Sequence, residues 1–381
     1  MKATVLERLD TLRGSTERLT YNARSLAALE NNPRCTLRAV LDASGSDKSR
    51  IAAHAGYPAP FGRSSFAFAR GKTFETAVKA NGCAALLRIL REMLGLTQME
   101  VGHEDLAEAG GDPSPAARHA RTRRLLVAAA RGQGEATLYD SPMLRLVVGG
   151  HPVFLEPDLV AFRIDGRFYV VEIKSFPIVD EQADPIAVRA ATMQASAYII
   201  ALRAMLAEAG AEPESVSDTI VLVGPKDFTN RPTGAIVDAT KQVATLTRQL
   251  DRIKRIGDLV DLLPEDLTFD LAIDEQERPH RPVPELITAL ETVPATYRPD
   301  CLNHCEMAFF CRARARAGHS LDVLGPTVRE HLGGIDTTTM TLGLARGNWQ
   351  PNEDQAEMAV ALRHAARLRD EALRGTPGVA P

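Results

Sequence analysis

The sequence predicts an α/β protein, in which a central mixed sheet flanked by helices is combined with helical N- and C-terminal regions. Two observations predict this fold class. Residues 143–173 contain three closely spaced runs rich in Val, Leu, Phe and Tyr, which are typical of strands. A long helical pattern and then a short apolar run at 219–223 follow directly. We place the resulting α/β core at residues 134–256.

Composition limits the classes of protein that this chain can belong to. It has 381 residues, enough for two or three domains, and it is 45% apolar and 25% charged, as soluble globular proteins are. The net charge of −4 gives no overall positive field, so any nucleic-acid surface must be local. The N-terminal sequence has no apolar signal segment, and we expect no membrane span. The expected location is the cytoplasm.

The first 133 residues are expected to be a helical region. Helical spacing of apolar residues covers 1–34, and the patterns at 71–97 and 114–131 are also helical. An interruption is expected at Asn81-Gly82. Residues 36–70 are rich in Gly, Ser, Pro and Arg and are expected to be mostly loop.

Within the core, the predicted strands are 143–148, 153–162 and 167–173, followed by 219–223 and a weaker one at 234–237. Asp165-Gly166 is a strong hairpin signal between the second and third strands. In the long helix that follows, Asp184 is suited to the N-cap, Pro185 to the first turn and Gly210 to the end. A further helix is expected over 238–256.

Two carboxylates and one amine are predicted to share a face of the sheet. Glu172 and Lys174 are two residues apart in a strand, so they point to the same side. A two-residue turn would pair Asp158 with Ile173 and point the carboxylate away. We therefore expect a three-residue connection, Ile164 to Gly166, which pairs Asp158 with Glu172.

Neighbouring carboxylates repel each other unless a cation lies between them, and their oxygens suit Mg²⁺ or Mn²⁺. Such an ion would polarise a phosphoryl oxygen and activate water. Lys174 would position that water and stabilise developing negative charge. The structural alternative is a salt bridge of Glu172 with Lys174 on an edge strand. The preceding Pro157-Asp158 and the hairpin favour a catalytic role over this salt bridge.

The five cysteines are unevenly distributed along the chain. Cys301, Cys305 and Cys311 fall within eleven residues, whereas Cys35 and Cys83 lie early. Clustered thiols in a reducing compartment indicate a metal site before a disulfide. Thiolates suit an iron–sulfur cluster and zinc equally well.

Together these motifs resemble the PD-(D/E)xK nuclease superfamily. Pro157-Asp158 and Glu172-Ile173-Lys174 carry the likeness. Gln194 and Tyr198 match the Q-x3-Y signature of its RecB-like branch, and Arg70-Gly71 with Glu75 resembles R-G-x-x-x-H, with Glu in place of His. The resemblance implies a restriction-endonuclease-like core. It implies catalytic roles for Asp158, Glu172, Lys174, Gln194 and Tyr198, and an Mg²⁺ or Mn²⁺ site at Glu75, Asp158, Glu172 and Ile173.

The cysteines add to this resemblance. RecB-like nucleases of the CRISPR-adaptation exonuclease type carry one Cys before the nuclease core and three after it, and these hold a [4Fe–4S] cluster. Cys35, Cys301, Cys305 and Cys311 have that order, with C-x3-C where C-x2-C is usual. The resemblance therefore implies a cluster that joins the terminal regions, with zinc as the alternative. Cys83 has no counterpart and is expected to be a buried thiol.

The resemblance implies a metal-dependent DNase, an exonuclease on single-stranded DNA or DNA ends, in repair, recombination or CRISPR/anti-phage processing. Its expected partners are DNA and a helicase or a CRISPR/defence protein. The alternatives are a catalytically degenerate iron–sulfur DNA-binding subunit, motivated by Glu75, and a zinc-stabilised structural partner. The expected domains are 1–133, with Cys35 and the Gly71/Glu75 motif, the nuclease core 134–256, the connection with the cysteines 257–318, and a helical tail 319–381.

Overall fold

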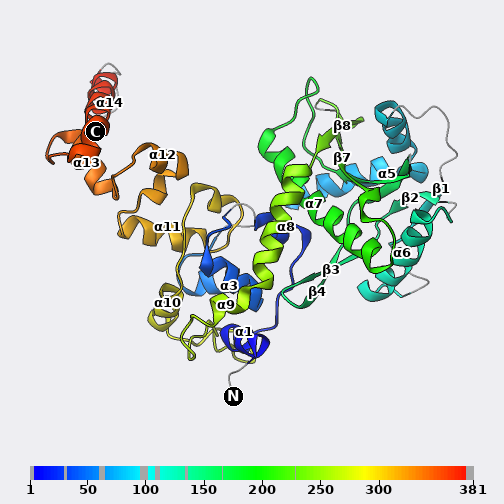
Figure 1. Ribbon diagram of the computed structural model, residues 1–381, viewed down its shortest axis with the longest axis horizontal. Coiled ribbons are helices and arrows are strands. Elements are labelled where there is room, and N and C mark those ends of the chain that lie inside the picture. Colours follow the sequence, from blue (N-terminus) through cyan, green and yellow to red (C-terminus); the bar gives the residue numbers. More distant parts are fainter. Residues whose placement is uncertain are drawn as a thin grey trace.

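The computed structural model describes residues 4–29, 32–59, 65–94, 102–107, 112–133, 136–164, 166–227 and 229–374. Over these residues the protein combines helices with two small sheets (Figure 1), so the predicted mixed helix-and-sheet class is confirmed at that level. The larger sheet has the strand order β1-β2-β5-β6-β7-β8, and β3 pairs with β4 separately. The strands are β1 (Gly102–Asp105), β2 (Ala136–Asp140), β3 (Leu144–Val148), β4 (His151–Leu155), β5 (Leu159–Ile164), β6 (Arg167–Ile173), β7 (Val216–Pro225) and β8 (Pro232–Asp238).

A parallel crossover lies at the centre of the larger sheet. β6 and β7 run parallel and are joined through α7 (Pro185–Glu208), while β5 and β8 flank them antiparallel. As predicted, the Asp184 carboxylate caps α7 by accepting from the N–H of Ile186 at 2.7 Å. Among the described helices, α7 alone is long and apolar enough to cross a membrane, but 67% of the apolar window is buried inside the protein. That burial is typical of a core helix.

The two faces of the sheet are covered by different helices. Alternate residues of a strand point to opposite sides. Phe168 and Val170 of β6 pack in one core with α7, whereas Val171 and Ile173 pack in another with α5 (Ser65–Leu94). Glu172 has the same parity as Val170, so its side chain lies on the α7 side of the sheet.

The helix α5 is broken where the sequence predicts. Ala80 to Cys83 have non-helical dihedral angles, and Asn81, Gly82 and Cys83 have φ values of 54°, 62° and 62°. Three consecutive left-handed residues turn the chain sharply between the two halves of the helix. The expected interruption at Asn81-Gly82 is confirmed.

The hairpin between β5 and β6 is built differently from the prediction. Ile164 pairs with Arg167 inside the sheet, so the expected three-residue connection is wrong; Asp165 lies outside the described residues. Instead, a register shift between Ala161 and Arg163 inserts one extra residue into β5, and this irregularity restores the pairing that the longer turn was expected to give. The predicted strand 153–162 is also wrong, because it is divided between β4 and β5 at Pro157, which lacks an N–H for a ladder.

A second core joins the N-terminal helices to residues 256–323. Figure 1 shows α1 and α3 beside α9 and α10. The expected loop over 36–70 is wrong, because Leu37, Val40 and Leu41 give α3 one buried face, and the left-handed Gly45 ends the helix. The expected helix over 1–34 is interrupted at Gly14, whose φ is 75°. The helices of this core are α1 (Val5–Arg13), α3 (Thr36–Ser44), α4 (Lys48–His54), α9 (Ile256–Val260), α10 (Val283–Thr292) and α11 (Ala308–Ala317), whereas α2 (Ala23–Ala28) packs with α7 in the first core.

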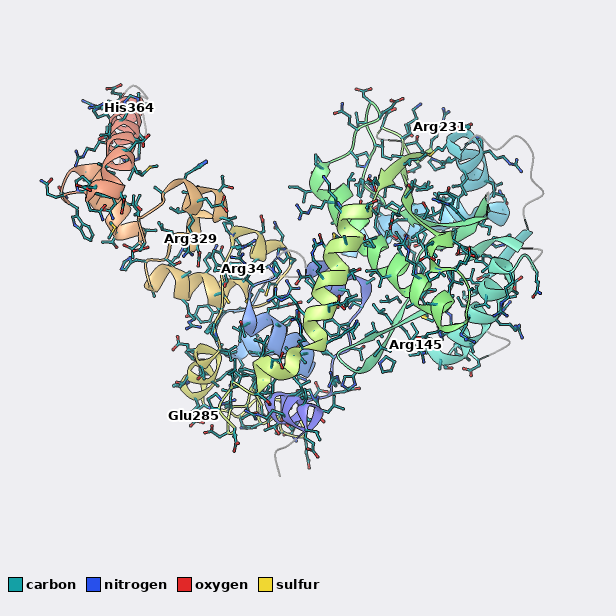
Figure 2. All side chains as sticks on the ribbon, viewed as in Figure 1. Arg34, Arg145, Arg231, Glu285, Arg329 and His364 are labelled. Atoms are coloured by element: carbon teal, nitrogen blue, oxygen red, sulfur yellow. The ribbon has the colours of Figure 1, made fainter. Side chains whose placement is uncertain are left out.

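The last helices form a small core of their own, centred on Leu332, Ile335 and Leu344. In Figure 1 they lie at the end of the molecule away from the sheet. Figure 2 shows Arg329 and His364 on this segment and Arg231 beside the sheet. The predicted domain limits remain predictions. The remaining helices are α6 (Pro115–Ala130), α8 (Thr240–Lys254), α12 (Pro326–His331), α13 (Thr338–Arg346) and α14 (Ala356–Arg374), with 3₁₀ turns at Pro213–Ser215, Pro299–Asn303, Leu321–Leu324 and Glu353–Gln355.

Gly234→Val is expected to lower the free energy of unfolding by about 1–3 kcal/mol, because it overpacks the contact between β8 and α5. A Cβ at Gly234 would lie 2.5 Å from Met93 Sδ and 2.6 Å from Ile89 Cγ2. Urea unfolding measures the change. Ala235→Val, on the opposite face of the strand, is the control, and equal stability of the two variants would contradict the prediction.

Candidate active site and metal centres

The structure brings Asp158, Glu172 and Lys174 together at the carboxyl end of β6; we call these three residues the carboxylate site. Lys174 Nζ lies 3.8 Å from Asp158 Oδ2 and makes a close ion pair with Glu172 Oε1. The backbone N–H of Ile173 donates to Asp158 Oδ2 at 2.8 Å. Leu159 pairs with Val171, so continuing this register brings Asp158 opposite Glu172, as predicted from the sequence.

Glu172 is an unusual buried acid. Its side chain is completely buried, and among the described residues neither carboxylate oxygen has a hydrogen-bond donor. The Lys174 ammonium pairs with Oε1 and lowers the cost of burying this charge. Burial, opposed by the Lys174 charge and reinforced by Asp158, raises the pKa of Glu172 to about 8. Buried carboxylate oxygens without hydrogen bonds are suited to bind a hard divalent cation. Glu172 and the neighbouring Asp158 therefore fit Mg²⁺ or Mn²⁺.

Asp158 differs from Glu172 in accepting a backbone hydrogen bond. Burial raises its pKa, and the Lys174 charge opposes that change. Its Oδ2 accepts from the Ile173 backbone. Ile173 therefore orients one of the two carboxylates through its N–H. Its predicted place among the metal residues remains a prediction.

Gln194 and Tyr198 lie on one face of α7, next to the carboxylate site. Gln194 Nε2 donates to the Tyr198 hydroxyl at 2.8 Å. Tyr198 is almost completely buried; burial first and the negative charge of Glu172 next raise its pKa well above the ordinary value. The influence of the Glu172 charge shows that the phenol lies within electrostatic reach of the carboxylate.

Glu75 lies on α5, and its carboxylate oxygens do not form a group within 4.8 Å with those of Asp158 and Glu172. Its charge contributes to the raised pKa of both Asp158 and Glu172. The Glu75 side chain is 38% exposed and lies 2.7 Å from Lys79 Nζ. A Cβ at Gly71 would lie 3.7 Å from Ser175 Oγ, so the Gly71/Glu75 segment runs beside the end of β6. Glu75 thus has a lysine partner, in addition to its position near the two acids.

The four cysteines Cys35, Cys301, Cys305 and Cys311, here the cysteine centre, are all buried in the second core and are all free thiols. Burial raises the pKa of Cys305 to about 12. Burial first, and then the charges of the other three thiols, raise the pKa of Cys311, so the four thiols lie within electrostatic reach of one another. Asn32 Nδ2 donates to Cys301 Sγ at 3.3 Å. Four buried free thiols have the chemistry of a soft metal centre, although no three of these sulfurs lie within 4.8 Å of one another in the structure.

Sequence reasoning missed a third grouping, made of Cys83, His103 and Asp140, here the edge group. One potential ligand atom from each residue lies within 4.8 Å of the other two, so the group could hold a metal ion. Cys83 is completely buried, as expected. His103 and Asp140 lie on β1 and β2, which were not predicted as strands, so no sequence signal brought them near Cys83.

The metal-free protein is expected to lose stability as pH rises from 4.5 to about 8, the ordinary and folded-state pKa values of Glu172. The folded state binds the proton more tightly than the unfolded chain, so this stabilisation is full below pH 4.5 and is lost as pH rises through about 8. Asp158, whose pKa is also raised, acts in the same direction. Thermal unfolding in EDTA across this range measures the effect. Glu172→Gln should flatten the curve, and equal slopes in both proteins would contradict the assignment.

Scans against protein-family models and against curated proteins find no match for this chain. Among solved structures, one described as "Crystal structure of SSO0001" aligns with 44% of this chain and 84% of its own chain, at 13% sequence identity. The TM-score of that alignment is 0.18, too low to support any argument about fold or function.

Proposed function

We propose that this protein is a metal-dependent DNase with a restriction-endonuclease-like core of the PD-(D/E)xK type. The observation that carries the proposal is Glu172, a completely buried carboxylate whose two oxygens lack hydrogen bonds among the described residues, beside Asp158 and Lys174. Lys174 offsets part of the cost of burying the Glu172 charge, and a divalent cation held by both carboxylates would offset the rest. The sequence order of the motifs supports the same class of enzyme.

Each residue of the carboxylate site has a distinct role in this proposal. Asp158 and Glu172 hold the ion, with Glu75 and Ile173 as the remaining metal residues. A bound Mg²⁺ or Mn²⁺ supplies Lewis acidity to the phosphodiester. Lys174 orients the attacking water and stabilises the negative charge that develops on the phosphoryl oxygens.

Gln194 and Tyr198 support this site from α7. The hydrogen bond from Gln194 holds the Tyr198 hydroxyl, and both this phenol and Glu172 are buried away from bulk water. A drier site strengthens the attraction between the carboxylates and the ion. These two residues are therefore proposed to position the reacting groups.

The cysteine centre is proposed to hold a [4Fe–4S] cluster, with zinc as the alternative. Cys35 precedes α3, and the other three thiols come from the segment around α11, so a cluster would join distant parts of the chain. The visible absorbance of anaerobically purified protein, with metal analysis, separates the two: a coloured iron protein supports the cluster and a colourless zinc protein supports zinc.

We propose DNA as the substrate, either single-stranded or at duplex ends, in the cytoplasm. A role in repair, recombination or CRISPR/anti-phage processing would involve a helicase or a CRISPR/defence protein as partner. The test is end-labelled single-stranded DNA, blunt duplex and RNA incubated with the full chain and Mn²⁺, Mg²⁺ or EDTA. Metal-dependent shortening of single-stranded DNA is expected, and its absence in Glu172→Gln ties cleavage to this site.

One observation favours a second candidate, a degenerate iron–sulfur DNA-binding subunit. Glu75, which stands where the related nucleases have a metal-binding His, is ion-paired with Lys79 at 2.7 Å. A carboxylate neutralised in this way is a weaker metal ligand. Binding of DNA ends without cleavage in any divalent metal would support this candidate and reject the DNase.

A further inference from the structure

The edge group combines three different ligand types from three separate elements. Cys83 lies at the break in α5, His103 on β1 and Asp140 on β2. Their ligand atoms are within 4.8 Å of one another. In a tetrahedral zinc site, bond lengths of about 2.0–2.3 Å separate neighbouring ligand atoms by roughly 3.3–3.8 Å. Side-chain movements of about 1 Å would therefore close the group around one ion.

The backbone at Cys83 supports a specific role for this residue. Its φ of 62° is in the left-handed region, which a non-glycine residue adopts at a cost of roughly 1–2 kcal/mol. The left-handed run turns Cys83 toward the strands, and its side chain is completely buried in the core that also contains Leu138 of β2. Such strained residues persist where the surrounding structure holds them and are concentrated at functional sites.

The two carboxylate oxygens of Asp140 have different neighbours. Oδ1 accepts from Ser141 Oγ at 3.0 Å and pairs with Lys79 Nζ at 2.8 Å. Oδ2 lies 3.8 Å from His103 Nε2, at the distance where an ion could bridge the two atoms. The residue is 8% exposed, whereas His103 is exposed, so an ion can enter from the histidine side.

We propose that Cys83, His103 and Asp140 bind a thiophilic divalent ion of the Zn²⁺ class. One sulfur, one nitrogen and one oxygen suit a borderline-soft metal and do not suit Mg²⁺, which requires oxygen ligands. A thiolate and a carboxylate balance the double charge of the ion. The Cys83 thiol proton passes to solvent as the sulfur–metal bond forms, and water fills the fourth position.

The test uses Co²⁺ as a spectroscopic probe of the full chain, purified anaerobically with the cysteine centre loaded. Wild-type protein should bind one more Co²⁺ per chain than His103→Ala and Cys83→Ser, with a thiolate-to-cobalt absorption band that both variants lose. His103 is exposed, so its replacement leaves folding intact even if Cys83→Ser fails to fold. Asp105→Asn is the matched control, because Asp105 pairs with Asp140 across β1 and β2 but is outside the edge group.

Equal Co²⁺ stoichiometry and equal spectra in wild type, His103→Ala and Cys83→Ser would overturn the proposal. Loss of the band in Asp105→Asn as well would also overturn it, since the signal would then report general disturbance of the sheet edge. The readout is metal binding and not cleavage. A protein that binds this Co²⁺ but cuts no DNA would reject the DNase and leave the edge site standing.

Discussion

Lys174→Ala is expected to lower Mn²⁺-dependent cleavage of single-stranded DNA by about 10²–10⁴-fold, the usual cost of losing a group that transfers or stabilises charge in the transition state. Lys174 is the cation that contacts both Asp158 and Glu172, at 3.8 Å from the first and in a close ion pair with the second. With the ammonium removed, water loses its positioning group and the phosphoryl charge loses its partner. Initial rates at saturating Mn²⁺ measure the change in kcat.

Lys241→Ala is the control for this experiment, because Lys241 is an exposed lysine at the start of α8. It should cleave at the wild-type rate. Lys174→Ala should keep its circular dichroism spectrum, since the side chain lies at the end of the strand and not within a core. Cleavage by Lys174→Ala at the wild-type rate would remove Lys174 from the proposed mechanism.

With the proposed [4Fe–4S] cluster in the cysteine centre, Cys305→Ser is expected to remove its visible absorbance and to lower the thermal midpoint by about 10–20 °C. Loss of a structural metal is among the few single changes that cost about 5 kcal/mol or more, and about 2–4 °C accompanies each kcal/mol in a domain of this size. Cys305 is buried with the other three cysteines in the core that joins the two ends of the chain. Absorbance and differential scanning calorimetry of anaerobic protein measure both effects.

Leu286→Ile is the matched control for the cysteine centre, since Leu286 is buried in the same core but carries no ligand atom, and this swap conserves volume. It should keep the visible absorbance of the wild type. If Cys305→Ser keeps the same absorbance and iron content, Cys305 is not a ligand. A colour change in both variants would show that the signal reports folding and not ligation.

The elements predicted well from the sequence are those whose signals are local. Asp184 and Pro185 mark the start of α7, and Asn81-Gly82 marks the break in α5. Strands β1 and β2 were missed because they are only four and five residues long and end in acids. The segment holding α3 and α4 was read as loop because its Gly and Ser residues outweighed the apolar spacing of Leu37, Val40 and Leu41.

The carboxylate site was predictable in part. The two-residue spacing of Glu172 and Lys174 dictates that they share a face in any strand. The position of Asp158 depends on the irregular register between Ala161 and Arg163, and no Gly, Pro or Asn at that point of the sequence indicates such an irregularity. The edge group could not be predicted, since it needs the pairing of β1 with β2 and the direction of a left-handed cysteine, and both are set by tertiary structure.

The second core also determines when the protein can fold during synthesis. Helices α1, α3 and α4 are complete by residue 54, but their apolar partners extend to Cys311, about 250 residues later. At a translation rate of about 5–20 residues per second, the ribosome needs roughly 10–50 s to supply them. Until residues 256–311 have been made, the first helices lack the other half of this core. The N-terminal helices therefore complete their core only late in synthesis.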